Sequence, residues 1–173
     1  NREGDQWRFV MTPKQCSSAA NQFGHKRILA EMYAVSSQGI TFEDRKQIAD
    51  WFFIYGINYR CLHGSFYGMK GRRKRFYVPH LSHQQPWWED NLLISEYCSR
   101  VSYVMHQGTF CADILLLHPV ESAYCRFSSP GGGMNNPGGI GLDLNEMNDT
   151  FAGLSERLMK IHRGFEYGDE LIM

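Results

Sequence analysis

The sequence predicts an α/β fold built from successive β/α units. Apolar runs of strand length alternate with segments whose apolar residues recur at helical spacing. Only one predicted helix separates the first two strand-like runs, which implies parallel strands joined by crossover connections. Such units fit part of a (β/α)8 barrel or a doubly wound sheet. Both architectures place functional residues at the C-terminal ends of the strands.

The first part of the chain predicts two helices and two strands. Residues 12–23 begin with a Thr-Pro pair suited to a helix N-terminus, and their small residues suit close packing. Residues 28–35 form an apolar and aromatic run that is typical of a strand buried on both faces. Residues 41–56 predict a helix with a capping threonine, and residues 57–63 predict the next strand.

The second part begins with an unusually long segment without periodicity. Residues 64–88 are polar, aromatic and basic, and we expect a functional loop there. Residues 90–107 and 145–162 predict helices, and residues 112–119 predict a third buried strand. Residues 128–141 contain six glycines and two prolines, which favours an irregular connection.

These elements suggest how the chain is organised. Residues 1–127 would be later β/α units of a barrel, residues 128–141 a connection, and residues 142–173 a helix leading into a following region. The chain begins with asparagine and ends without a clear helix stop, so we expect it to be part of a longer polypeptide. A partial barrel would leave strand edges unpaired and might not fold or act alone.

Composition excludes several classes of function. The chain has 173 residues, 43% hydrophobic and 21% charged, as in a soluble globular protein. Eighteen basic and eighteen acidic residues give no overall charge that would favour nucleic acid or an anionic membrane. Five cysteines without a Cys-x-x-Cys pair argue against a zinc cluster or a disulfide framework. No apolar stretch approaches the roughly 20 residues that span a bilayer.

Glu31 is the strongest catalytic candidate. It lies in the apolar run at 28–35, where an ionised carboxylate is costly, next to Tyr33 and before a polar loop. A buried carboxyl there suits a general acid whose pKa must be raised by loss of hydration. The alternative is a structural glutamate paired with Lys26 or Arg27.

The motifs around Glu31 occur in a definite order. They are Glu-Met-Tyr at 31–33, Gly-Ile-Asn-Tyr-Arg-Cys-Leu-His at 56–63, Gly-Arg-Arg-Lys-Arg at 71–75, Gln-Pro-Trp-Trp at 85–88, and a Tyr- and Arg-containing helix ending at Gly108. In this order the chain resembles glycoside hydrolase family 106, the alpha-L-rhamnosidase-like enzymes, from about His25 to Pro119. It departs from the family pattern at Ala34, where a glycine is expected, and lacks a tryptophan shortly after, which leaves the sugar open.

The resemblance implies a bacterial TIM-barrel glycosidase that takes part in polysaccharide degradation and acts by carboxylate general acid/base catalysis. It implies an inverting reaction, with Glu31 as the acid and a second glutamate activating water. Glu121, after the third strand, is the best-placed second carboxylate in this chain, although the true base might lie outside it. The other interpretation of Glu121 is a loop carboxylate held by His118 or Arg126.

Further residues are candidates for holding the sugar. The resemblance favours Tyr33, Asn58 and His63 as hydrogen-bonding groups, and otherwise His63 is a satisfied core histidine. Trp87 and Trp88 offer apolar faces for sugar C–H groups or simply pack the loop, and we favour one tryptophan in each role.

Cofactors and partners follow from the same comparison. We expect no cofactor within this chain, but the resemblance implies calcium in the full-length protein, with ligands that the sequence does not identify. The expected partners are a carbohydrate substrate and the remaining domains of the parent polypeptide, without nucleic acid or membrane. The resemblance also implies a bacterial protein of the periplasm or the extracellular space.

Two alternatives stay open. The chain could be a noncatalytic carbohydrate-binding or structural fragment with the same fold, because fold does not fix function. The basic run at 70–75 is usually a solvated surface that pairs with acids elsewhere in a protein, but it also fits an anionic sugar subsite or, least well, nucleic acid.

Overall fold

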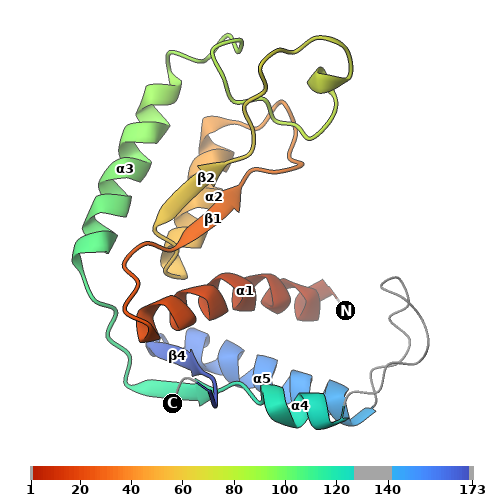
Figure 1. Ribbon diagram of the computed structural model, residues 1–173, viewed down its shortest axis with the longest axis vertical. Coiled ribbons are helices and arrows are strands. Elements are labelled where there is room, and N and C mark those ends of the chain that lie inside the picture. Colours follow the sequence, from red (N-terminus) through yellow and green to blue (C-terminus); the bar gives the residue numbers. More distant parts are fainter. Residues whose placement is uncertain (1, 127–141, 172–173) are drawn as a thin grey trace. The chain divides into compact units, whose positions relative to one another are not determined.

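The computed structural model describes residues 2–126 and 142–171. The chain divides into two compact units, one formed by Phe23–Thr109 and the other by Asn1–Gln22 together with Phe110–Met173. Within the described residues, no helix combines the length and the apolar character needed to cross a membrane. Each unit is built around a pair of parallel strands, so the α/β class is confirmed (Figure 1).

The unit of residues 23–109 contains a strand–helix–strand motif followed by a loop and a long helix. Its elements are β1 (Leu29–Met32), α2 (Phe42–Ile54), β2 (Tyr59–Leu62), the 3-10 helix η1 (Gly71–Lys74) and α3 (Asn91–Gln107). The expected crossover helix between two parallel strands is therefore present, and the strands are shorter than the sequence suggested.

Helix α2 begins where its sequence predicts. The Thr41 hydroxyl accepts a hydrogen bond from the Asp44 amide at 3.1 Å, and the Asp44 carboxylate accepts one from the Thr41 amide at 3.1 Å. This capping box satisfies two amide groups that would otherwise lack partners at the helix start. The helix runs to Ile54 and turns at Gly56, whose φ of 92° is favourable only for glycine.

The β1–β2 pair has one covered face. Met32 is 1% exposed, whereas Leu29 and Tyr59 are 51% and 47% exposed. The register pairs Glu31 with Cys61, so these two side chains share the face opposite to Met32, and both are exposed. The prediction that residues 28–35 form a strand buried on both faces is therefore wrong for the described residues, because only one face is covered.

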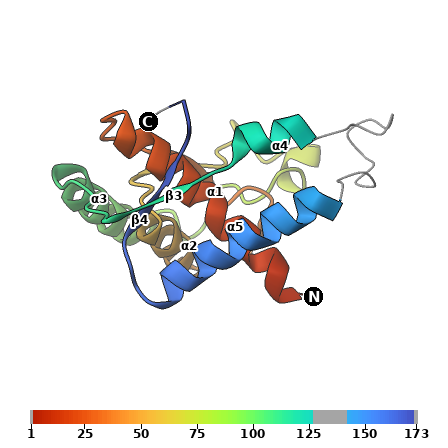
Figure 2. The same cartoon turned by 90° about the horizontal axis from the view of Figure 1, so that it is seen from below.

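The other unit also places a helix between parallel strands. Its elements are α1 (Arg2–Gln22), β3 (Ile114–Leu117), α4 (Val120–Arg126), α5 (Leu142–Lys160) and β4 (Phe165–Gly168). Strand β3 lies beside β4 (Figure 2), and the two pair in parallel, with Ile114 beside Phe165 and Leu117 beside Gly168. The third predicted strand is thus present as β3, and its partner among the described residues is β4.

Two elements of this unit, α1 and β4 (Phe165–Gly168), differ from the sequence-based expectation. Helix α1 begins at Arg2 rather than at Thr12, and Pro13 lies inside it. A proline removes one backbone hydrogen bond, yet the preceding turn keeps Val10 and Met11 buried. Strand β4 was not predicted. The glycine-rich connection at 128–141 lies outside the described residues, and with it both proposed domain boundaries.

A small apolar core joins the helices to the strands of this unit. It consists of Met11, Phe151, Phe165 and Tyr167, with Ile114, Leu116, Ala152, Leu158 and Met159 partly buried around it. The rings of Phe151 and Tyr167 lie 5.0 Å apart, and those of Phe165 and Tyr167 lie 5.2 Å apart, edge to face. All four residues of β4 are buried.

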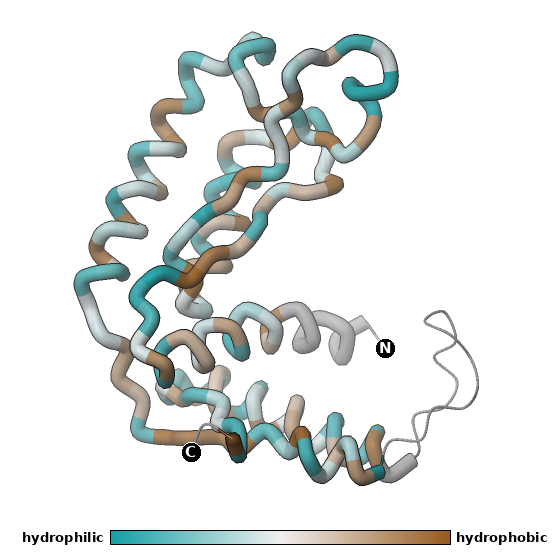
Figure 3. Tube along the Cα trace, in the orientation of Figure 1, coloured by the Kyte–Doolittle hydropathy of each residue, from teal (hydrophilic) through white to brown (hydrophobic). Residues whose placement is uncertain are grey.

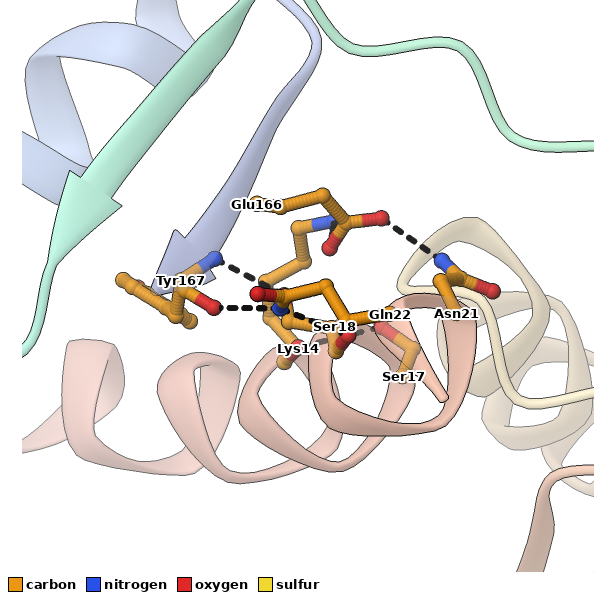
Figure 4. A network of polar contacts seen from close by, with 7 residues as sticks. All are labelled: Lys14, Ser17, Ser18, Asn21, Gln22, Glu166 and Tyr167. Carbon is orange, nitrogen blue, oxygen red and sulfur yellow. Dashed lines mark hydrogen bonds and ion pairs between the residues drawn. The ribbon is translucent and has the colours of Figure 1, made fainter. Parts of the chain in front are cut away.

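Helix α1 closes the outer edge of β4 with side chains. The Ser18 hydroxyl accepts a hydrogen bond from the Tyr167 amide at 3.0 Å, and the Gln22 side chain donates to the Tyr167 carbonyl at 2.7 Å (Figure 4). Both Ser17 and Ser18 are fully buried, as the small residues of this segment predicted. An unpaired strand edge is a site for unwanted pairing, and here helix side chains occupy it.

Candidate functional site

The C-terminal ends of β1 and β2 form one rim. The strands are parallel, and the His63 amide donates to the Met32 carbonyl at 3.0 Å just past their last paired residues. Glu31, Tyr33 and His63 therefore lie at the same end of this sheet. That end is where the sequence placed the site, because ligands of parallel sheets bind beyond the carboxyl ends of the strands.

Glu31 is solvent-exposed and makes no hydrogen bond or ion pair with any described residue. The two cations proposed as structural partners have other contacts. The Lys26 ammonium donates to the Gly108 carbonyl at 3.1 Å and to Thr109 at 3.3 Å, and the Arg27 guanidinium lies 5.7 Å from the Tyr59 ring. The described residues thus leave Glu31 unpaired, but they do not supply the burial that the general-acid argument assumed.

Tyr33 is turned away from solvent. Its φ of 76° interrupts the extended backbone, and its side chain is 5% exposed. The hydroxyl donates to the Arg45 carbonyl of α2 at 3.0 Å and accepts from Arg60 at 3.4 Å. Burial raises the pKa of Tyr33, against the opposing effect of the Arg60 guanidinium. These contacts give Tyr33 a structural role in joining β1 to α2.

Asn58 lies at the opposite end of β2, before its first residue. Its side-chain oxygen accepts from the Ile28 amide at 2.9 Å, and its side-chain nitrogen donates to the Lys26 carbonyl at 2.8 Å. Asn58 is 7% exposed, and its backbone carbonyl accepts a hydrogen bond from the Ser102 hydroxyl. Asn58 therefore aligns the entry of the chain into β1, and it does not lie with Glu31 and His63.

His63 retains binding capacity at the rim. Its Nδ1 atom is buried and has no hydrogen-bond partner among the described residues. The ring lies 6.2 Å from that of Tyr77 at an interplanar angle of 69°. A buried ring nitrogen without a partner is costly, and a ligand hydroxyl would satisfy Nδ1 once the ring turns to expose it.

The long loop after β2 is organised by a buried histidine. His80 is fully buried, its Nδ1 accepts from the Phe66 amide at 3.0 Å, and its Nε2 lies 2.7 Å from the Ser82 hydroxyl. Since Nδ1 is an acceptor, neutral His80 carries its proton on Nε2 and donates to Ser82, which excludes Ser82 as a nucleophile activated by this ring. No sequence periodicity marked His80, because the loop has none.

The two tryptophans of the loop have different surroundings. Trp87 packs edge to face on Phe42 at 5.8 Å, and the buried Arg45 guanidinium lies 4.6 Å from the Trp87 ring and 4.3 Å from the Phe42 ring. Burial lowers the pKa of Arg45. Trp88 is 41% exposed. Trp87 therefore holds the loop to α2, and Trp88 offers a free apolar face.

The second candidate carboxylate belongs to the other unit. Glu121 is exposed in the first turn of α4, shortly after β3. Loss of hydration and the neighbouring Glu121 carboxylate raise the pKa of Glu170, so two acids approach each other beyond β3 and β4. His118 stacks on Phe151 at 4.7 Å, and burial lowers its pKa.

Two hollows follow the carboxyl ends of strands. One, of about 620 Å³, is lined by Ser65, Phe66, Tyr67 and His83 in the loop after β2. The other, of about 380 Å³, lies beyond β3 and is lined by residues of β3, α4 and α5, including Leu117, Glu146 and Phe151. Glu31 lines neither of them.

The arrangement can be compared with known families. The model of glycoside hydrolase family 106, described as alpha-L-rhamnosidase, matches residues 2–158. The chain belongs to glycoside hydrolase family 106. The match covers both units and supports a glycosidase function with a carbohydrate substrate. No curated protein matches the chain, and no solved structure does either.

The resemblance to this family implies calcium, which would need a group of ligand side chains close together. Among residues 2–126 and 142–171, no three side chains of His, Cys, Asp or Glu gather closely enough to hold a metal ion. Calcium also takes carbonyl and amide oxygens as ligands, so calcium in the full-length protein stays an expectation from the resemblance. None of the five cysteines, all of which lie in the described residues, forms a disulfide, and four of them are exposed.

Proposed function

We propose that this chain supplies part of the active site of an alpha-L-rhamnosidase in which Glu31 is the general acid. The family match carries the proposal, and the geometry of β1 and β2 supports the choice of residue. Glu31 is a carboxyl without a partner in the described part of the chain, near the C-terminal end of a parallel strand and on the face opposite to buried Met32. In a (β/α)8 barrel the helices lie outside, so this face would be the interior, where further strands exclude water.

The proposed reaction inverts the anomeric centre. The protonated Glu31 carboxyl donates its proton to the glycosidic oxygen as the bond to the anomeric carbon breaks. A second carboxylate takes a proton from water, and that water attacks the opposite face of the sugar. Glu121 is our candidate for this base, which requires the two carboxyl groups to be ~6.5–9.5 Å apart in the assembled protein.

We assign sugar binding to the rim residues that have a polar atom without a described hydrogen-bond partner or an exposed ring face. His63 Nδ1, which has no described partner, would hydrogen-bond a sugar hydroxyl, and the exposed face of Trp88 would stack on sugar C–H groups. Tyr33, Asn58 and Trp87 are instead positioning residues, because their polar groups or rings are used within the fold.

The test compares Glu31→Gln with the native protein on two substrates, p-nitrophenyl and methyl alpha-L-rhamnoside. General acid catalysis contributes about 10²–10⁴-fold, and more for a poor leaving group, so the loss should be larger on the methyl glycoside. Glu89→Gln, at an exposed glutamate in the loop before α3, is the matched control. Equal turnover by native protein and Glu31→Gln on methyl rhamnoside excludes Glu31 as the acid.

A noncatalytic carbohydrate-binding role is the second candidate, and the exposure of Glu31 in the described residues favours it. In that case the native protein would bind rhamnosides in a titration without hydrolysing them. Proton NMR of a reaction mixture distinguishes the two, because hydrolysis with inversion releases the sugar in a single anomeric form before mutarotation.

A further inference from the structure

The loop between β2 and α3 concentrates positive charge. Residues 64–88 contain five lysines and arginines and no aspartate or glutamate. Since the whole chain has eighteen of each sign, the remainder has thirteen basic and eighteen acidic residues. The net charge of zero is therefore the sum of five positive charges in this loop and an excess of five negative charges in the rest of the chain. Figure 3 shows the loop's hydrophilic stretch.

These five cations have no acidic partner among the described residues. Lys70 and the four cations at 72–75 are all exposed, and none makes an ion pair there. The Arg72 guanidinium lies 5.5 Å from the Phe76 ring, and an Arg73 nitrogen lies near the backbone of Gly68. Several like charges held close together repel one another, so an anionic ligand would relieve a cost that this fold carries.

The basic segment is tied to the hollow beside it. The Gln38 side chain donates to the Lys74 carbonyl at 3.5 Å and accepts from the His80 amide at 3.0 Å. His80 in turn accepts from the Phe66 amide and stacks on the Phe66 ring at 5.4 Å and an interplanar angle of 6°. Residues of the basic turn and of the hollow are thus fixed by one hydrogen-bond network.

The hollow itself carries groups suited to a sugar. Tyr67 is 98% exposed, so its ring is free to stack on the apolar face of a pyranose. Ser65 and His83 are exposed at the same hollow and offer hydrogen-bonding groups to hydroxyls. An aromatic surface beside polar groups is the usual composition of a carbohydrate site.

We propose that Tyr67 and the basic turn 70–75 form an auxiliary binding site for an acidic glycan, separate from the Glu31 rim. Tyr67 stacks on one sugar ring, and Arg72, Arg73 and Lys74 bind carboxylates of neighbouring uronic acid residues. Arginine suits this task because its planar guanidinium pairs with a carboxylate through two hydrogen bonds. The choice of a glycan over other polyanions rests on the proposed carbohydrate function.

The experiment measures binding of the protein to polygalacturonate by titration calorimetry at low salt. Fully methyl-esterified polygalacturonate has the same backbone without charge and serves as the ligand control. The variants are Arg72→Gln/Arg73→Gln/Lys74→Gln and Tyr67→Ala. The matched protein controls are Arg100→Gln and Tyr103→Ala, at an exposed arginine and a 67% exposed tyrosine of α3.

We expect the charged polymer to bind and its methyl ester to bind at least about tenfold more weakly. The triple variant should lose about tenfold in affinity and Tyr67→Ala about fivefold, with both controls unchanged. Binding should also weaken as salt rises, because the cations are exposed.

Three results would overturn the proposal. Equal binding of the ester removes the role of charge, and an unaffected Tyr67→Ala variant reduces the effect to general ion exchange. Tighter binding of single-stranded RNA than of polygalacturonate at the same salt identifies a different class of ligand. Turnover of Glu31→Gln tests the Proposed function independently, so either idea can fail without the other.

Discussion

The buried ion pair between α1 and β4 gives the most direct test of how the unit containing α1 and β4 is held together. The Lys14 ammonium lies 3.1 Å from a Glu166 carboxylate oxygen, and the two side chains are 8% and 11% exposed. The Asn21 side chain donates to the other oxygen at 2.6 Å (Figure 4). The perturbation is Lys14→Met, which keeps the apolar stem and removes the charge.

The expected loss of unfolding free energy follows from the Glu166 charge, which Lys14→Met leaves buried without its cation. Breaking a buried pair by removing one partner costs about 3–5 kcal/mol. We expect the lower end, about 3 kcal/mol, because Asn21 still donates to Glu166 and the site is not completely closed. Glu166→Gln should cost less, about 2 kcal/mol, since the ammonium retains the rings of Phe110 at 4.2 Å and Phe165 at 5.4 Å.

The assay is a double-mutant cycle. Urea unfolding followed by circular dichroism gives the free energy of unfolding, and hydrogen exchange of the amides at 165–168 reports this unit separately. The variant with both changes should lose about 2 kcal/mol less than the sum of the single losses, because neither charge is then left alone. If the single losses add within about 0.5 kcal/mol, the pair does not couple α1 to β4 and the reasoning fails.

Three further changes test individual contacts. Asn58→Ala should lower the free energy of unfolding by about 1–3 kcal/mol in urea titrations, because the buried Ile28 amide loses its acceptor, and Asn58→Asp, which keeps that acceptor, should lose less. Thr41→Ala should cost about 1 kcal/mol by removing the N-cap of α2, whereas Thr41→Ser should retain stability. The pKa of Tyr33 is raised in the folded state, so its contribution is complete below the unfolded value of 10.0 and is lost as the pH rises above it. Tyr33→Phe should therefore show a shallower loss of stability between pH 9 and about pH 11 in urea titrations, and an unchanged slope would contradict the burial argument.

Local sequence signals were reliable where they depend on neighbouring residues. The Thr41 cap and the end of α3 at Gly108 appear where the sequence placed them. The packing role expected of one tryptophan is present at Trp87, which packs against Arg45, and the sugar contact expected of the other stays a prediction for exposed Trp88. The parallel pairing of β1 and β2 followed from one intervening helix.

Signals that depend on distant contacts were less informative. The Thr-Pro pair at 12–13 favours a helix start, but the helix continues through it. Strand β4 is too short to show a period, and it is identified by its pairing with β3. The alternation of residues in β1 did not show which face would be covered, so Glu31 was expected to be buried.

For the candidate site too, the motifs predicted some features and missed those that depend on distant contacts. Sequence motifs brought Glu31 and His63 to one rim, because parallel strands end together. They could not reveal that the Asn58 and Tyr33 side-chain polar groups are used within the fold, since those hydrogen bonds join residues up to 32 positions apart in the chain. The sequence likewise did not predict the hydrogen bonds of His80.

By itself the sequence determined the α/β class, the helix–strand alternation and the order of motifs that marks family 106. These properties depend on hydrophobic period, capping chemistry and residue order, all of which are local. Only the tertiary structure decided which polar side chains are occupied and which are free, because satisfaction of a hydrogen bond depends on what the folded chain brings within about 3 Å. Within residues 2–126 and 142–171 it left the Glu31 carboxyl, His63 Nδ1 and the cations of the basic turn without a hydrogen-bond or ion-pair partner from a side chain.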